Sequence, residues 1–182
     1  MTPTVDRTDC QECSEERFAV HPIFELCKAK RFDEALHLCK DDIAQKPDDP
    51  ASYRHMADVL ELAQRPKEAL PFRDKVLELA PNSAASYFSR GDLFYQTGNY
   101  PGAIQDFSKA AELDSHGALS PLAHLYRADC HRRLKAYDEA ITDCQRVPDN
   151  FNFPGFLGER AGGKQHLLAA IARERGLRAT TR

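Results

Sequence analysis

"YPGAIQDFSKAAELDS", Tyr100 to Ser115, is a short amphipathic stretch whose pattern recurs along the chain. Related stretches begin at Phe32 (FDEALHLCKDDIAQKP), Pro66 (PKEALPFRDKVLELAP) and Tyr137 (YDEAITDCQRVP). All four carry an alanine at the same place, and these alanines lie 34, 34 and 37 residues apart: Ala35, Ala69, Ala103 and Ala140. A period of this length predicts stacked structural repeats, each of which buries its apolar face against the next.

A second helical stretch precedes each of the last three alanines. A small residue stands 12 positions before each of these alanines: Ala57, Gly91 and Ala128. Large apolar residues recur around them at helical spacing, namely Tyr53, Leu60, Tyr87 and Phe94. Because small side chains let two helices cross closely, each unit is predicted to be a helix hairpin.

This pattern resembles the tetratricopeptide repeat family. In the third unit the matching residues are Tyr87, Arg90-Gly91, Phe94, Tyr100, Ala103, Phe107 and Ala110, and in the second they are Tyr53, Met56-Ala57, Leu60, Ala69, Val76 and Pro81. The resemblance covers residues 16–147 and implies an all-α, right-handed α-solenoid of about four helix hairpins, in units of about 16–49, 50–83, 84–120 and 121–147. In the first unit, His21-Pro22-Ile23 predicts a short or bent first helix.

The two ends depart from the repeat. Residues 1–15 are predicted to be a flexible acidic tail, and residues 148–182 a Phe-rich loop, a capping helix and a basic tail. The capping helix, residues 163–175, has an apolar stripe of Leu167, Leu168, Ile171 and Ala172, and Gly176 is expected to end it.

Composition excludes several classes of function. The chain of 182 residues has a net charge of −3, which gives no overall attraction to nucleic acid or anionic lipid. It has no run of 18 apolar residues, and its first twenty residues contain no apolar run like that of a signal peptide. We therefore expect a cytoplasmic protein with no nucleic-acid or membrane partner; its oligomeric state is left open.

Gly158, Gly163 and Lys164 fall on the spacing of a phosphate-binding loop. Gln165 stands where the Mg²⁺-binding Ser or Thr of such a loop belongs, and Pro148 and Pro154 break the segment where a strand would be needed. We interpret the motif as the entry to a helix, whose N-terminus could hold an anionic group of a partner.

Other candidate sites are weak. Cys10 and Cys13, with His21 and Cys27, lack the second Cys pair of a zinc site, so no metal is predicted. Cys39 and Cys144 occupy equivalent places in their units and are expected to be buried free thiols. We find no catalytic nucleophile paired with a general base, and we predict neither an enzyme nor a cofactor.

Three aspartates follow the small residues directly: Asp58, Asp92 and Asp129. Stacked hairpins would align them along the concave side of the array, beside Arg54, Glu61, Phe88, Tyr95, Tyr126, Arg132 and Arg133. This acidic and aromatic groove would suit a peptide bearing Lys or Arg and an apolar anchor. The alternative is that these aspartates pair with Arg54, Arg90 and Arg127 and only fix the stacking.

The Phe-rich loop has two interpretations. Phe151, Phe153 and Phe156 could fold back to seal the last hairpin. They could also anchor a partner, together with Lys164.

The resemblance implies a non-enzymatic adaptor that binds a protein or peptide in its concave groove. Some members of the family hold the C-terminal carboxylate of chaperones, but Asp58 and Asp92 would repel a carboxylate. Two other classes stay open: a dedicated inhibitor, such as an immunity protein that neutralises a bacterial toxin, and a self-assembling scaffold.

Overall fold

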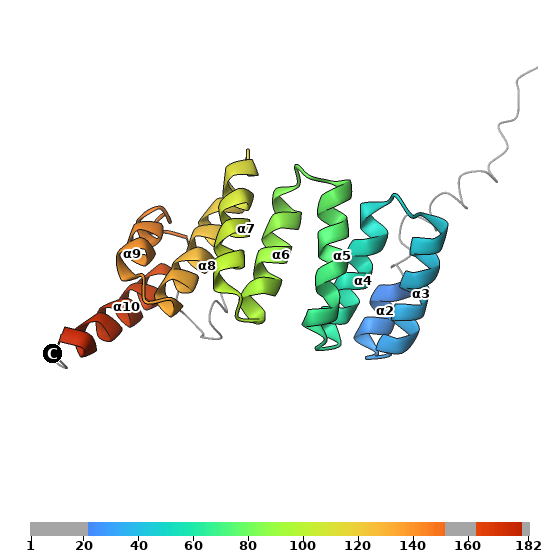
Figure 1. The fold of residues 1–182 in the computed structure, drawn as a ribbon, viewed down its shortest axis with the longest axis horizontal. Coiled ribbons are helices and arrows are strands. Elements are labelled where there is room, and N and C mark those ends of the chain that lie inside the picture. Colours follow the sequence, from blue (N-terminus) through green and yellow to red (C-terminus); the bar gives the residue numbers. More distant parts are fainter. Residues whose placement is uncertain (1–21, 152–162, 180–182) are drawn as a thin grey trace, which may run out of the picture.

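The computed structural model describes residues 22–151 and 163–179, and within these ranges it has nine α-helices and no β-strand. The helices stand side by side in an elongated row (Figure 1). They are α2 (Pro22–Lys28), α3 (Phe32–Gln45), α4 (Pro50–Leu62), α5 (Pro66–Leu79), α6 (Ala84–Gln96), α7 (Tyr100–Leu113), α8 (Ser120–Arg133), α9 (Tyr137–Gln145) and α10 (Gly163–Ala179). The predicted all-α solenoid of four hairpins with a capping helix is confirmed.

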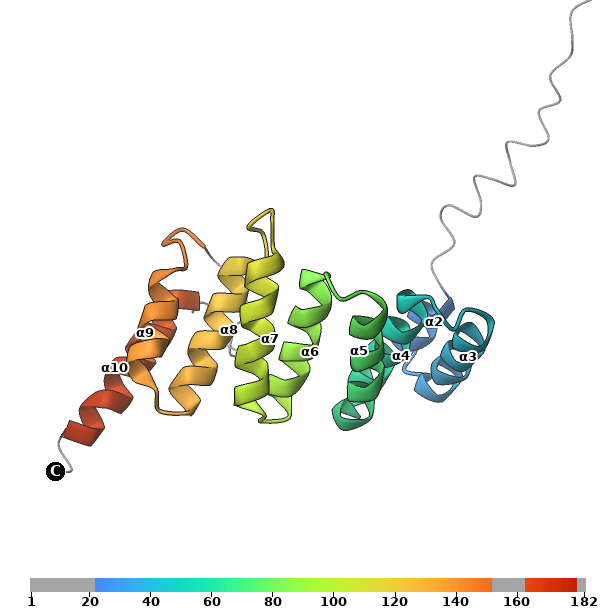
Figure 2. The same ribbon diagram turned by 45° about the horizontal axis from the view of Figure 1, so that its top comes forward.

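The hairpins α2–α3, α4–α5, α6–α7 and α8–α9 stack in chain order, and α10 packs on α8 and α9 at the end of the row (Figures 1 and 2). The first helix of one hairpin also contacts the first helix of another, α2 with α4 and α6 with α8. Among the described residues, no comparably extensive packing joins two second helices, or α4 with α6. We call the surface formed by the first helices α2, α4, α6 and α8 the inner surface.

The turn inside each hairpin has the same backbone conformation. One residue, five positions before the repeating alanine, has a positive φ: Lys30 (58°), Gln64 (60°), Gly98 (81°) and Lys135 (64°). The next N–H then bonds to a carbonyl five residues earlier, as Arg65 does to Leu60 at 2.8 Å. Only one of these turns has the glycine that usually indicates such a helix end.

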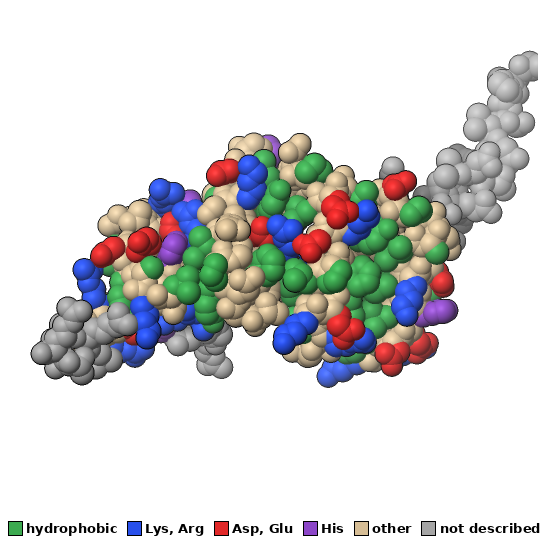
Figure 3. Space-filling view, in the orientation of Figure 1, with side chains coloured by type: hydrophobic (Ala, Val, Ile, Leu, Met, Phe, Trp, Pro, Cys, Tyr) green, Lys and Arg blue, Asp and Glu red, His purple; other side chains and the backbone are tan. Residues whose placement is uncertain are grey.

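Arginines join neighbouring hairpins. Arg90 of α6 pairs with Asp106 of its own hairpin at 2.7 Å and with Asp74 of the preceding one at 2.8 Å. Arg127 of α8 repeats the arrangement, with Asp143 of its own hairpin and with the Ser108 hydroxyl of the preceding one at 2.8 Å. The face of the array drawn in Figure 3 shows acidic and basic side chains interspersed.

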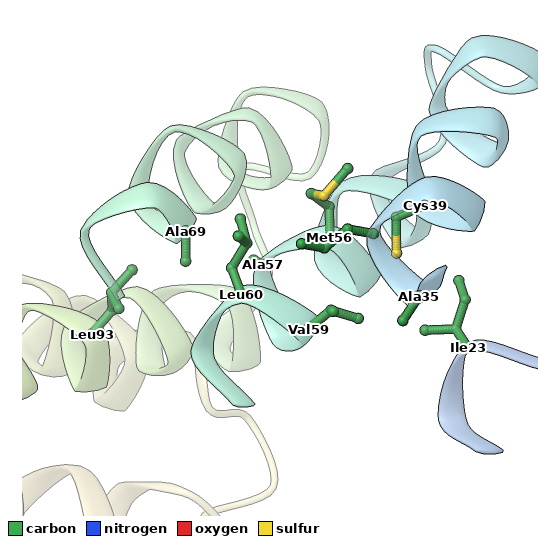
Figure 4. Packing of buried hydrophobic residues seen from close by; sticks show 10 residues of the cluster. Ile23, Ala35, Cys39, Met56, Ala57, Val59, Leu60, Ala69 and Leu93 are labelled. Atoms are coloured by element: carbon green, nitrogen blue, oxygen red, sulfur yellow. The ribbon is translucent and has the colours of Figure 1, made fainter. Parts of the chain in front are cut away.

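Small residues stand where the helices cross. The four repeating alanines are fully buried, as are Ala57 and Ala128. Between them lies a series of apolar clusters, of which the first runs from Ile23 of α2 to Leu93 of α6 (Figure 4). Its packed residues come from α2 to α6, so one core continues across the hairpin boundaries.

Gly91 is needed because of the residue that it faces. A Cβ at this position would lie 3.0 Å from the ring of Phe107 and 3.2 Å from the Cβ of Asp106. At the equivalent place in the last hairpin, Ala128 is accommodated, and the residue equivalent to Phe107 there is the smaller Cys144.

Gly91→Val is therefore expected to lower the free energy of unfolding by about 1–3 kcal/mol through overpacking, as measured by urea denaturation. Gly176→Val is the control, because nothing lies within 4 Å of a Cβ at Gly176 and the expected change is within about 0.5 kcal/mol. In a Phe107→Ala background the cost of Gly91→Val should fall by at least about 1 kcal/mol. Equal costs in both backgrounds would show that the Phe107 ring is not what excludes a side chain.

The prediction that Gly176 ends the last helix is wrong, because α10 continues to Ala179. Glycine inside a helix costs only about 1 kcal/mol, and burial of Leu167 and Ile171 against the last hairpin outweighs it.

The expected short first helix is confirmed, since α2 has seven residues. The predicted tail, residues 1–15, lies outside the described residues.

Cys39 and Cys144 are fully buried free thiols, as predicted. Burial raises the pKa of Cys39 to about 12 and that of Cys144 to about 11. Both therefore act as small apolar side chains in the core.

Candidate functional site

The structure brings three of the predicted acidic residues together. Asp58 and Glu61 of α4 both accept from Arg73 of α5, whose Nη2 lies 2.6 Å from Asp58 Oδ1 and 2.7 Å from Glu61 Oε1. Asp92 of α6 interacts electrostatically with Glu61 and Arg73. The result is one acidic cluster on the inner surface, consisting of Asp58, Glu61 and Asp92.

Burial makes the charges of Glu61 and Asp92 costly. Burial raises the pKa of Glu61; Arg73 opposes this shift, and the nearby Asp58 and Asp92 add to it. Burial also raises the pKa of Asp92, against a hydrogen bond from Gln96 and the charge of Arg73. Two carboxylates thus pair with one buried guanidinium and a third lies within its electrostatic influence, so a further cation would lower the electrostatic energy of all three.

The predicted aromatic residues form a packed cluster between α6 and α8. The ring of Tyr126 lies 5.5 Å from that of Phe88 and 5.4 Å from that of Tyr95, both edge-on. Phe107 of α7 completes the cluster at 5.3 Å from Tyr126. Burial, with the charge of Asp92 as a second cause, raises the pKa of Tyr126 to about 12. Phe107 is fully buried, whereas the other three rings are partly buried and form one wall beside the acidic cluster.

Asp129, the third predicted aspartate, has no exposed surface. It accepts hydrogen bonds from Tyr95 at 2.6 Å and from Arg132 and Arg133 at 2.7 Å each. Arg132 also pairs with Glu174 of α10, and the Arg133 guanidinium lies 5.2 Å from the centre of the Tyr95 ring. Asp129, Arg132 and Arg133 therefore hold α6, α8 and α10 together, and Asp129 offers no charge to a partner.

The alternative named the wrong arginines, because Arg54, Arg90 and Arg127 do not pair with the three aspartates, but Asp129 is internally paired and joins neighbouring helices as that alternative expected. Arg90 and Arg127 pair with acids of the second helices, as described above. Arg54 is exposed on α4, one turn before Asp58, and has no ion pair among the described residues.

Lys164 and Phe151 lie at the junction of α9 and α10. The Lys164 ammonium donates to the Val147 carbonyl at 2.8 Å and to Asp149 at 2.5 Å, so it holds the start of α10 against the end of the last hairpin. Phe151 is partly buried against the cluster beneath α10. Phe153, Phe156 and Gly158 lie outside the described residues.

The described ranges contain no group of three or more His, Cys, Asp or Glu side chains placed to hold a metal ion. Cys10, Cys13 and His21 are outside these ranges. Of the helices that the structure describes, none is long and apolar enough to span a bilayer.

The sequence model of the tetratricopeptide repeat family matches residues 72–118 and 89–153. This chain is a tetratricopeptide repeat protein. Such proteins mediate protein–protein interactions and are generally not enzymes. The matches begin within α5 and cover the last two hairpins.

Solved structures share the fold of this tetratricopeptide repeat protein. One crystal structure of MamA has a TM-score of 0.72 at 17% identity, with 89% of each chain covered. MamA from Desulfovibrio magneticus RS-1 has a TM-score of 0.61 at 19% identity, with 69% of each chain covered. PilW, described as a type IV pilus biogenesis factor, has a TM-score of 0.59 at 17% identity, over 68% of this chain and 56% of its own. At these identities the likeness concerns the fold alone.

Two features of the inner surface were missed from the sequence. Arg73 stands where the other hairpins have buried Cys39, Phe107 and Cys144, and a charged residue at a core position was the available signal. Phe24 stands 34 residues before Asp58, so it holds the equivalent place in the first unit. The position that carries an aspartate in the later units therefore carries an aromatic residue in the first.

Proposed function

We propose that this protein is a non-enzymatic adaptor that binds a protein or peptide of basic and apolar character on its inner surface. The acidic cluster of Asp58, Glu61 and Asp92 carries the proposal. Asp58 and Glu61 of α4 pair with one buried arginine, Arg73, and Asp92 of α6 interacts with the same arginine electrostatically. The family supports it, because tetratricopeptide repeat proteins bind other proteins.

A lysine or arginine of the partner is the complementary group. The raised pKa values of Glu61 and Asp92 mean that folding has already made their charges unfavourable. A cation brought next to them relieves this cost, whereas an acidic partner increases it. Because the cluster is partly buried, salt screens its charges less than it would at a fully exposed site.

The test is a peptide array that compares Lys- and Arg-rich peptides with Glu-rich peptides of the same apolar content. Wild-type protein is expected to prefer the basic peptides, and Asp58→Asn with Asp92→Asn should weaken their binding about tenfold. Glu61 is left in place so that buried Arg73 keeps a carboxylate. Fluorescence anisotropy with the best peptide measures the loss.

The control is Glu78→Gln with Glu112→Gln, which removes two charges from exposed positions on the second helices. It should leave binding within about twofold of wild type.

Binding of the basic peptide to wild-type protein should also weaken as the pH falls through the raised pKa values of Glu61 and Asp92, because the protonated acids lose their attraction for a cation. Equal binding of basic and acidic peptides would contradict the proposal.

A further inference from the structure

A small apolar pocket lies between α2 and α4, beside the acidic cluster. Three residues of α2 line it on one side, Ile23, Phe24 and Cys27, and four residues of α4 on the other, His55, Asp58, Val59 and Leu62. Its volume is about 180 Å³. An apolar cavity of about 150 Å³ is large enough for a benzene ring, so this pocket can receive a leucine or phenylalanine side chain.

The pocket has an apolar rim exposed to solvent. Phe24 is 54% exposed and Leu62 is 56% exposed, whereas Val59 at the base is 1% exposed. Figure 4 shows Val59 of α4 extending toward Ile23 of α2, which closes the base. Exposed apolar side chains that gather around a cavity are a feature of binding surfaces.

The repeat shows how the residues around this pocket differ from their equivalents in the later hairpins. Phe24 occupies the place that Asp58, Asp92 and Asp129 hold in the later hairpins. Leu62 occupies the place of Gln96 and Arg133. The inner surface therefore changes along its length from apolar at α2 to acidic across α4 and α6.

The charges beside the pocket decide which occupant fits. Asp58 itself lines the pocket and also belongs to the acidic cluster. On the opposite rim, the Lys28 ammonium lies 4.5 Å from the centre of the Phe24 ring and 3.0 Å from Glu25. Lys28 therefore pairs with Glu25 of its own helix, and Asp58 pairs with Arg73, so a cation brought to the α4 side would share Asp58 with Arg73.

We infer that the pocket between α2 and α4 receives a bulky apolar side chain of a partner peptide, and that a Lys or Arg within two residues of it pairs with Asp58 and Asp92. This inference rests on the proposed binding of a basic partner and adds the position and chemistry of its anchor. It also places the two groups along the array, with the apolar residue over α2 and the basic residue over α4 and α6.

The test uses four synthetic ten-residue peptides in a Gly/Ser background: Leu followed by Lys-Lys, Ser followed by Lys-Lys, Leu followed by Glu-Glu, and Ser followed by Glu-Glu. Wild-type protein should bind the Leu-Lys-Lys peptide at least tenfold more tightly than the Ser-Lys-Lys peptide. Phe24→Ser with Leu62→Ser should remove this preference for Leu but keep the preference for Lys over Glu. Asp58→Asn with Asp92→Asn should remove the preference for Lys over Glu but keep the preference for Leu over Ser.

Leu134→Ser is the matched control, because Leu134 is also a large exposed apolar residue, at 46%, but lies at the end of α8 away from the pocket. It should bind like wild type, and circular dichroism should show that all variants keep their helices. If the Phe24/Leu62 variant still prefers Leu, the pocket is overturned while the proposed function stands. If no protein prefers Lys to Glu, both fail. A wild-type dimer that becomes monomeric in the Phe24/Leu62 variant would assign the pocket to a second copy of this chain and overturn the inference.

Discussion

Asp129→Ala is expected to lower the free energy of unfolding by about 3–5 kcal/mol, because it leaves buried charged donors without their acceptor. Asp129 receives hydrogen bonds from Tyr95, Arg132 and Arg133, and all three lose their shared partner. Tyr95 belongs to α6, and Arg132 also pairs with Glu174 of α10, so contacts on both sides of α8 weaken. Urea denaturation followed by circular dichroism measures the change.

Asp92→Asn is the control, since it changes the equivalent residue of the preceding hairpin. The raised pKa of Asp92 shows that its charge is unfavourable in the folded chain, so the amide should leave stability unchanged or slightly higher. Similar costs for Asp129→Ala and Asp92→Asn would contradict the role given to Asp129.

The pH dependence of stability gives a second test of the role of Asp129. Burial alone would raise the pKa of Asp129, but the hydrogen bonds from Tyr95, Arg133 and Arg132 outweigh it and hold the pKa below its usual value. The stability that Asp129 contributes is therefore fully present above the unfolded pKa, about 3.9, and is lost as the pH falls through the folded value. Asp129→Ala should lack this part of the acid transition.

Phe107→Ala is expected to cost about 3–5 kcal/mol, because Phe107 is fully buried and its removal leaves a cavity in the middle of the array. Its ring packs 5.2 Å from Phe88 and 5.3 Å from Tyr126, so α6, α7 and α8 all lose contacts. In a stacked array each hairpin contacts only its neighbours. Hydrogen exchange should therefore speed up in α6 to α8 and stay nearly unchanged in α2 and α3.

Leu134→Ala removes apolar surface that is already half exposed, and should change stability by no more than about 0.5 kcal/mol. A uniform rise in exchange over all the helices of the Phe107→Ala variant would show instead that the array unfolds as one cooperative unit.

Much of the fold was predictable because the signals that carry it are periodic and local. The repeating alanines and the small residues 12 positions before them are buried at the helix crossings. Cys39 and Cys144 were placed in the core by the same repeat. The end of α10 was not predictable from Gly176, because burial of apolar residues upstream outweighs the preference of one glycine.

The candidate site was predictable only in part. Asp129 has Arg132 and Arg133 three and four residues later, a spacing that places them on one helix face and could have indicated the pairing. Asp58 has Glu61 and Leu62 at the same two places, and Asp92 has Tyr95 and Gln96. These local differences distinguish three aspartates that occupy the same position in successive repeats.

The sequence by itself determined the helix hairpins, their stacking order and the residues that occupy equivalent places on the first helices, because a helix places its side chains by position along the chain. Only the tertiary structure decided which of those residues keep a charge for a partner. Arg73 reaches Asp58 from 15 residues away, and Tyr95 covers Asp129 from 34 residues away. Burial and ion pairing depend on residues that folding brings together, and no local pattern specifies these distances.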